Sequence, residues 1–235
     1  VGSEMCIRDS PTIILNFKRH YFMIKKVYCG GKNYRIENIY CIGRNYSAHI
    51  AELQHEKDSE LMAFIKPNSA LVGEESLIHL PLFSQEIDYE CEVVVLIRKA
   101  QNHQPTVAGF ALGIDLTARD LQRQAIKKGL PWLKCKGFKA SALISKFIDV
   151  SLIANWQAIS FSLSINGRTV QQGNTNAMLY PIQEIVTTLD KWYGLQEGDI
   201  IYTGTPQGVG QVRAGDRLEL NLENTPLHAH FQIAS

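Results

Sequence analysis

DYECEVVVLI, residues 88–97, is the stretch that decides the expected fold, because it places two acids directly before an unbroken apolar run. Such a run of Val, Leu and Ile favours a buried β-strand. Glu90 and Glu92 are two positions apart, so in a strand both carboxylates point to the same face. Neighbouring like charges repel each other, and an otherwise apolar strand is an unfavourable place for them. A bound cation would resolve this conflict.

Asp115 is the third candidate ligand for such a cation. It follows the apolar run VAGFALGI and precedes TARDLQ, where a strand is expected to give way to a helix and side chains commonly face a cleft. Hard cations such as Mg²⁺ prefer oxygen ligands of this kind. A structural interpretation is also open, in which Glu90 and Glu92 form a solvent-facing acidic edge and Asp115 caps a helix.

Most of the remaining chain alternates short β-like runs with Gly and Asn turns, which predicts an α+β fold that is mostly β. Asn166-Gly167 lies between two alternating runs and predicts a two-residue hairpin turn. Residues 181–194, PIQEIVTTLDKWYG, predict the clearest helix, because four apolar residues repeat at i, i+3, i+4 and i+7 after the first-turn proline. Shorter helices are expected at residues 45–54 and 117–129, and two further strands at residues 216–233.

The composition fits one globular domain whose partner is a small molecule. The chain has 235 residues, 45% of them hydrophobic, and a formal net charge of +1. Acidic and basic side chains are mixed, which gives no basic tract for nucleic acid or for an anionic membrane. The apolar run at residues 93–97 is far shorter than the ~20 residues of a membrane-spanning helix. The five cysteines lie far apart without a CxxC motif, which favours reduced thiols and a cytoplasmic location.

Several blocks occur in order between residues 39 and 220: GRNYSAHIAEL, FIKP, DYECEVVVLI, GIDLTARDLQ, KGLPW, KGF and GDIIYTGTPQGVG. Taken together, this ordered set resembles the fumarylacetoacetate hydrolase family. It looks closest to the small single-domain members, which act as acylpyruvate hydrolases, with oxaloacetate decarboxylation as a related activity. Since no single block is specific, the resemblance rests on their number and order.

The resemblance implies the family's mixed β-sheet roll with a few short helices, a Mg²⁺ or Mn²⁺ ion and usually a homodimer. It places the metal ligands at Glu90, Glu92 and Asp115. The family's water-activating His-Glu pair falls on His49 and Glu52, whose i, i+3 spacing lets the side chains meet on one helical face. Taken alone, that pair is also typical of the polar surface of a helix.

The resemblance also implies contacts with a 2-oxo acid substrate. The family's substrate-side lysine falls on Lys136, its glutamine on Gln122 and its loop threonine on Thr205. Without the family pattern, Lys136 is also readable as an ordinary surface lysine. Two features depart from the pattern: the prolines common before the FIKP block are missing, and Gly137 stands where serine is common.

The chemistry implied by these residues is cleavage of the carbon–carbon bond of a 1,3-dicarbonyl acid. Such hydrolysis needs an activated water and a stabilised enolate, and the metal with Lys136 would supply the positive charge for the enolate. His49 suits a general base because its ordinary pKa of about 6.5 lies near neutral pH. The predicted protein is a metal-dependent acylpyruvate-type hydrolase. The alternatives are an oxaloacetate decarboxylase or an isomerase of ring-cleavage products, and a non-catalytic metabolite-binding protein.

Residues 1–22 are expected to lie outside the fold. VGSEMCIRDS, residues 1–10, is a plausible translation of a widely used transposase sequencing adapter, and residues 11–22 fit upstream read-through before Met23. Residues 23–235 are then expected to form a single catalytic domain.

Three further motifs have less specific interpretations. TGTPQGVG, residues 203–210, lacks the lysine of a phosphate-binding loop and predicts a turn. His228 and His230 alternate on the last predicted strand and are expected on an exposed face. Arg119 and Asp120 predict either an ion pair with each other or an Arg119 that braces the acidic cluster.

Overall fold

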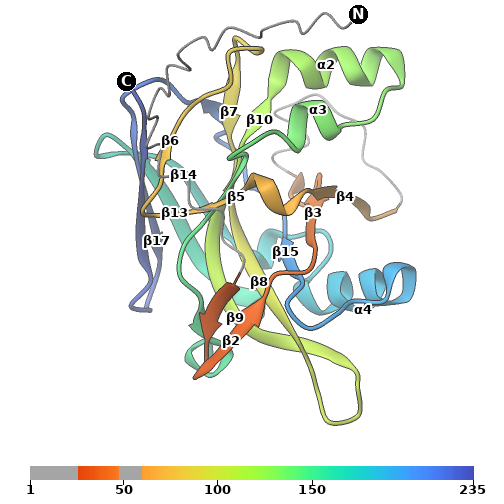
Figure 1. Cartoon of the computed structure of the whole chain (residues 1–235). Helices are drawn as coiled ribbons and strands as arrows, with labels where there is room; N and C mark the ends of the chain where they lie inside the picture. The colour runs from red at the N-terminus through yellow and green to blue at the C-terminus, as the bar shows by residue number, and fades with distance from the viewer. Residues whose placement is uncertain (1–25, 48–59) are drawn as a thin grey trace, which may run out of the picture.

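The computed structural model describes residues 26–47 and 60–235, and in this part of the chain the strands form four sheets beside a few short helices (Figure 1). The predicted mostly β fold is thereby confirmed. The largest sheet has eight strands in the order β4-β3-β15-β8-β9-β11-β5, with β12 paired to β9. Its strands are Met62–Lys66 (β4), Ile39–Gly43 (β3), Ile200–Tyr202 (β15), Cys91–Lys99 (β8), Pro105–Asp115 (β9), Ala142–Ile144 (β11), Leu71–Gly73 (β5) and Ile148–Asp149 (β12).

The second sheet has five strands in the order β14-β13-β17-β18-β6, and two small sheets complete the described strands. The five strands are Arg168–Asn174 (β14), Ser160–Ile165 (β13), Arg217–Leu222 (β17), His228–Ile233 (β18) and Leu77–Ile78 (β6). The small sheets consist of Thr117–Ala118 (β10), Ile87–Tyr89 (β7) and Gly210–Gln211 (β16), and of Lys26–Cys29 (β1) and Lys32–Arg35 (β2).

β8 lies between β15 and β9 and is buried on both faces. Val93 and Val95 pack into one hydrophobic cluster, while Val94 and Leu96 pack into a second one on the other face. Burial of each such side chain contributes roughly 1.5–3 kcal/mol, so an uninterrupted apolar run suits this central position. By the same alternation, Glu92 lies on the face of Val94 and Leu96.

The five-stranded sheet is buried on one face. In β17, Leu218 and Leu220 are buried, whereas Arg217 is exposed and Glu219 is partly exposed. The predicted hairpin is confirmed between β13 and β14, because Asn166 and Gly167 both adopt left-handed backbone conformations with φ of 52° and 80°. These are the conformations that a type I′ hairpin turn requires.

The helices are α2 (Arg119–Lys128), α3 (Leu133–Lys136) and α4 (Ile182–Tyr193). α2 ends at Gly129 as predicted, and the four apolar residues of α4 form a buried stripe after Pro181, which is the N-cap rather than a first-turn residue. α3 was not predicted, because four residues are too few to show helical periodicity. Short 3₁₀ turns occupy Asn68–Ala70, Val150–Leu152, Trp156–Ala158 and Thr175–Ala177.

α2 and α3 lie together at one end of the strands, near β7 and β10, whereas α4 lies apart from them (Figure 1). The helix predicted at residues 45–54 falls mostly outside the described residues. Among the helices that the structure describes, none combines the length and apolar character needed to cross a membrane.

Candidate metal centre and active site

Three carboxylates meet where β8 begins and β9 ends. Glu90 lies between β7 and β8, Glu92 is in β8 and Asp115 ends β9. β8 and β9 are antiparallel neighbours, with Glu92 opposite Gly113, which brings the start of one strand beside the end of the other. One carboxylate oxygen from each acid lies within 4.8 Å of the others. The acids predicted to act together are therefore gathered in space.

Burial excludes the structural interpretation of these acids. Glu90, Glu92 and Asp115 are 5%, 2% and 1% exposed, so they do not form a solvent-facing edge. The N-cap of α2 is Ala118, so Asp115 is not the cap of that helix. A buried cluster of carboxylates requires compensating positive charge.

Lys136 supplies part of that charge from the last position of α3. Its Nζ lies 2.7 Å from Glu90 Oε2 and 2.8 Å from Asp115 Oδ2, and it donates a third hydrogen bond of 2.6 Å to Thr117 Oγ1. Burial opposes its charge, but Asp115 and Glu90 outweigh that effect and raise the pKa of Lys136. The side chain is 3% exposed, so it is not an ordinary surface lysine.

Arg119 supplies a second positive charge from the start of α2. Its guanidinium contacts Asp88 Oδ2 at 2.8 Å and Glu90 Oε1 at 2.6 Å. Asp120 does not pair with it and instead accepts a hydrogen bond from Ser84 Oγ. The interpretation in which Arg119 braces the acidic cluster is therefore the one that the structure shows.

Glu92 differs from its two neighbours in having no ion pair with any residue that the structure describes. Its Oε2 accepts a 2.7 Å hydrogen bond from the Gly204 amide. Burial raises the pKa of Glu92 well above its ordinary value, and the charges of Asp115 and Glu90 raise it further. A buried carboxylate in this setting attracts either a proton or an additional cation.

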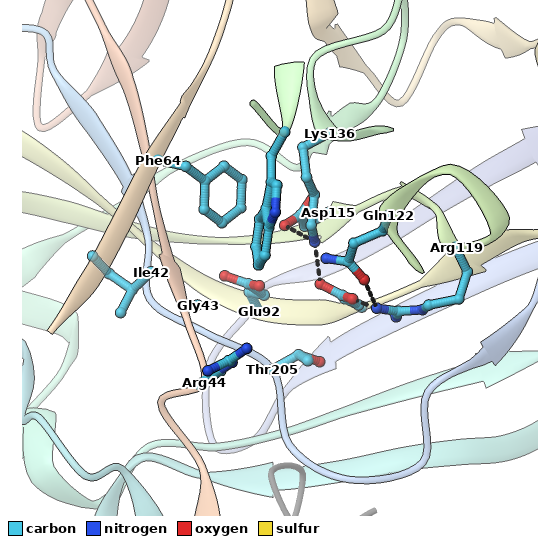
Figure 2. Close-up of a pocket in the computed structure, with 12 residues that line it drawn as sticks. Ile42, Gly43, Arg44, Phe64, Glu92, Asp115, Arg119, Gln122, Lys136 and Thr205 are labelled. Carbon is cyan, nitrogen blue, oxygen red and sulfur yellow. Dashed lines mark hydrogen bonds and ion pairs between the residues drawn. The ribbon is translucent and has the colours of Figure 1, made fainter. Parts of the chain in front are cut away.

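The carboxylates lie in a pocket that combines charged and apolar walls. In Figure 2, Phe64 and Ile42 lie on one side of the acids and Gln122 and Arg119 on the other. The lining residues are Ile42, Gly43, Arg44, Phe64, Glu90, Glu92, Asp115, Arg119, Gln122, Trp132, Lys136 and Thr205. All six site residues predicted within the described part of the chain belong to this set. The pocket thus unites segments far apart in the sequence.

Gln122 and Thr205 already have partners within the protein. Gln122 Oε1 accepts a 2.6 Å hydrogen bond from Arg119, which leaves the amide NH₂ of Gln122 to face the pocket (Figure 2). The Thr205 hydroxyl donates to the Cys91 carbonyl at 2.9 Å and accepts from Gln171. A Thr205 hydrogen bond to substrate stays a prediction, and it requires the hydroxyl to leave Cys91.

Sequence reasoning did not single out the apolar wall or Arg44. Phe64 and Trp132 form an edge-to-face pair with ring centroids 5.8 Å apart. Arg44 has a φ of 58°, unusual for a residue with a side chain, and it lies at the pocket beside Thr205 (Figure 2). These residues carry no periodic pattern, and only the blocks GRNYSAHIAEL, FIKP and KGLPW mark their segments.

The outcome for the remaining motifs is mixed. His49 and Glu52 lie outside the described residues, so their predicted role stays a prediction. His228 and His230 are exposed on β18, as expected. TGTPQGVG contains no helix; it is an irregular connection with φ of 103° at Gly204, and its last residue begins β16.

The site fits a divalent cation. All three candidate ligands offer carboxylate oxygens, which are the ligands that Mg²⁺ and Mn²⁺ prefer. Four acids, Asp88, Glu90, Glu92 and Asp115, share three cationic partners among the described residues, Lys66, Arg119 and Lys136. A further cation would therefore have a set of carboxylate oxygens as ligands, including Glu92, which has no ion pair with a described residue.

Residues 38–231 match the family model described as fumarylacetoacetate (FAA) hydrolase C-terminal. The chain belongs to this family of enzymes. It is 37% identical over 205 residues to the mitochondrial oxaloacetate tautomerase FAHD1 of Mus musculus, with 85% of this chain and 87% of that protein covered. It is 34% identical to the oxaloacetate tautomerase YcgM of Escherichia coli, over 88% of this chain and 92% of the relative.

A solved structure supports the same fold. Fumarylpyruvate hydrolase from Pseudomonas aeruginosa, in complex with Mn²⁺ and pyruvate, superposes with a TM-score of 0.80 at 28% identity. The alignment covers 92% of this chain and 98% of that chain. The expected fumarylacetoacetate hydrolase fold is thereby confirmed.

Proposed function

We propose that this protein is a divalent-metal-dependent enzyme that converts a small 2-oxo acid through its enolate, with tautomerisation of oxaloacetate as its reaction. The observation that carries the proposal is the meeting of three buried carboxylates with the Lys136 ammonium in one pocket. The names of the two tautomerases that are 37% and 34% identical to this chain support the choice of oxaloacetate.

Glu90, Glu92 and Asp115 are the proposed ligands of a Mg²⁺ or Mn²⁺ ion. When bound, the ion would supply Lewis-acid stabilisation of negative charge on the keto oxygen of the substrate. The Mn²⁺ present with pyruvate in the fumarylpyruvate hydrolase structure supports this proposal. The homodimer and the cytoplasmic location remain predictions from the sequence.

Lys136 is the proposed donor to the substrate oxygen that becomes negative when the neighbouring carbon gives its proton to a water molecule. Its raised pKa keeps it an ammonium at neutral pH, so it acts as a positive charge and hydrogen-bond donor rather than as a base. The Gln122 amide would orient the substrate carboxylate. The Phe64 and Trp132 rings form an apolar wall that limits the access of water.

Hydrolysis of an acylpyruvate-type acid is the second candidate function. Its support is the predicted His49 and Glu52 pair, together with the likeness to a fumarylpyruvate hydrolase at 28% identity. Hydrolysis uses the same enolate stabilisation but also needs a base that activates water. Tautomerisation of oxaloacetate needs only a proton acceptor, which we propose to be water, and decarboxylation needs no nucleophile, so a His-Glu pair that activates a water nucleophile separates the candidates.

A substrate panel tests both functions. Wild type would be assayed with oxaloacetate, acetylpyruvate and fumarylpyruvate in the presence of Mn²⁺ or Mg²⁺, with the spontaneous rates subtracted. We expect enolisation of oxaloacetate to be accelerated, and EDTA to abolish the acceleration. Full activity in EDTA would exclude the metal role, and metal binding without any turnover would support a metabolite-binding protein.

His49→Ala then separates the two candidates. Because it removes the predicted base for water, we expect it to abolish any acylpyruvate hydrolysis and to spare a larger share of oxaloacetate tautomerisation. Glu52→Gln should act in the same direction with a smaller loss, since it leaves the imidazole in place. Equal loss of every activity in His49→Ala would contradict this division.

A further inference from the structure

Lys66, at the end of β4, is a buried lysine that does not line the pocket. Its side chain is 0% exposed, and its Nζ lies 2.7 Å from Asp115 Oδ1. The set of residues around the pocket includes Asp115 and Lys136 but not Lys66. Lys66 therefore reaches the acidic cluster from behind, on the side of Asp115 away from the pocket.

The three ammonium hydrogens of Lys66 all have backbone acceptors. They go to the carbonyls of Leu116 at 3.1 Å, Ser141 at 2.9 Å and Lys136. Among the described residues no donor makes a hydrogen bond of acceptable geometry to Asp115 Oδ1, so its contact with Lys66 is an ion pair. The Lys66 ammonium thus holds the backbone of Leu116, which follows Asp115, and the backbone of Lys136 at the same time.

Two reciprocal ring contacts join the same two segments. Lys66 Nζ lies 5.8 Å from the centre of the Phe138 ring, just after α3, and Lys136 Nζ lies 5.2 Å from the centre of the Phe64 ring in β4. A Cβ on Gly137 would lie only 2.9 Å from Pro67 Cδ. The end of α3 and the end of β4 are therefore in close contact, and Lys66 lies at the centre of that contact.

We propose that Lys66 is a positioning residue that holds Asp115 and Lys136 in fixed relation to each other. The inference rests on the proposed function, because it gives these two residues their roles in metal and substrate binding. Lys66 acts through its neighbours and does not touch the substrate. Its removal takes one donor from each of three buried carbonyls, of which Lys136 O keeps the Ser141 hydroxyl and Ser141 O keeps the Leu116 amide. It also leaves Asp115 without one of its two cationic partners, so both the acid and the lysine are held less firmly.

Lys66→Met tests this inference, because methionine has a similar length and no charge. We expect Mn²⁺ to bind about 10-fold to 100-fold more weakly by calorimetric titration, which is the usual loss when support behind a ligand is removed. At saturating Mn²⁺ we expect kcat for the preferred substrate to fall by about the same factor, with KM changed much less. Rates are normalised to the calorimetric number of metal sites, so that unfolded protein is not counted.

Leu163→Ala is the matched control for a loss of stability alone. Leu163 is fully buried in β13 of the five-stranded sheet, and its truncation should destabilise the protein without changing Mn²⁺ affinity or kcat per metal site. If Lys66→Met behaves like this control, Lys66 is only structural and the inference is overturned. Tighter Mn²⁺ binding would overturn it as well, because Lys66 would then act as a competing charge.

Ser141→Ala is a milder second variant in case Lys66→Met does not fold. Ser141 Oγ donates a 2.7 Å hydrogen bond to the Lys136 carbonyl, the same oxygen that Lys66 contacts. We expect a smaller loss of kcat in the same direction, and an unchanged kcat would count against the inference. If wild type turns over no substrate, the proposed function fails, whereas Mn²⁺ affinities of the variants still decide the role of Lys66.

Discussion

β8 and β17 contain acids in similar sequence settings, yet the two strands place them in opposite environments. β8 carries Glu92 within CEVVVLIRK, and β17 carries Glu219 within RLELNL. Glu92 is 2% exposed and has no described cationic partner, whereas the Glu219 side chain is 43% exposed and pairs with Arg217 at 3.0 Å. The difference shows that the environment of an acid in a strand depends on whether one face or both faces of its sheet are packed against other parts of the protein.

The physical cause lies in the position of each strand. β8 is an inner strand packed on both faces, so a carboxylate there is removed from water. β17 is packed on one face, and alternation directs its polar side chains outward. Surface ion pairs of the β17 kind contribute roughly 0–1 kcal/mol, whereas an unpaired buried charge costs several kcal/mol. The exposed ion pair in β17 favours solubility, whereas the buried carboxylate in β8 is suited to binding a cation.

The largest expected difference comes from neutralising each acid. Glu92→Gln should weaken Mn²⁺ binding by about 100-fold or more and abolish activity at ordinary metal concentrations, because a candidate ligand is lost. Glu219→Gln should leave both within about twofold of wild type. Calorimetric titration with Mn²⁺ measures the affinities. Unchanged binding in Glu92→Gln would remove Glu92 from the ligand set.

Breaking the arginine pairs should give the next largest difference. Arg119→Met leaves Asp88 and Glu90 without their shared partner, and we expect a loss of about 3–5 kcal/mol in the free energy of unfolding. Arg217→Met removes an exposed pair and should cost less than about 1 kcal/mol. Urea unfolding of both variants provides the comparison, and similar losses would show that burial does not distinguish the pairs.

The pH dependence should also separate the two acids. Because burial raises the pKa of Glu92 above its ordinary value of 4.5, Mn²⁺ affinity should fall as pH decreases through that raised pKa, at a higher pH than for an exposed glutamate. In the metal-free protein the native state holds this proton more tightly than the unfolded chain. Its stability should therefore decrease as pH rises from 4.5 to the raised pKa.

Glu92→Gln and Glu219→Gln also serve as variants for the pH measurement. Calorimetric titrations and thermal unfolding between about pH 5 and 8 should show the slope in wild type and in Glu219→Gln, and a reduced stability slope in Glu92→Gln. A wild-type Mn²⁺ affinity that does not change with pH would contradict the raised pKa.

The smallest effect is expected at the hairpin of the five-stranded sheet. Asn166 combines a left-handed backbone with a 2.9 Å hydrogen bond to Asp216. Asn166→Ala should lower the free energy of unfolding by about 1 kcal/mol, because alanine disfavours that backbone conformation. The Mn²⁺ affinity should not change, and a clear change would show that the two sheets are energetically coupled.

The local patterns of the chain predicted much of this fold. Periodicity located α4, Gly129 located the end of α2, and Asn166-Gly167 located a hairpin, because each depends on neighbouring residues alone. The spacing of Glu90 and Glu92 predicted a shared strand face, but burial of the acids depends on distant strands. Asp115 was proposed from its place at the expected strand-to-helix switch, and the ordered family blocks assign the same residue.

The support of the site could not be derived from local sequence. Lys66 and Lys136 approach Asp115 from segments 49 and 21 positions away, and only the tertiary structure brings them together. The short α3 that positions Lys136 has no periodic signal. Arg119 was found in part, because its place at the start of a predicted helix left two interpretations open, an ion pair with Asp120 and support of the acidic cluster.

The backbone amide of Cys91, between Glu90 and Glu92, has an unusual acceptor. Cys91 donates its backbone N–H to the side chain of Gln171 in β14, at 2.9 Å, and Gln171 in turn donates to Thr205 and to the Pro206 carbonyl. Deuterium uptake at this single amide therefore reports how often the five-stranded sheet separates from the pocket. Slow exchange there would show that the contact between the five-stranded sheet and the pocket opens only rarely. The acidic cluster would then lie on one of the most stable parts of the protein.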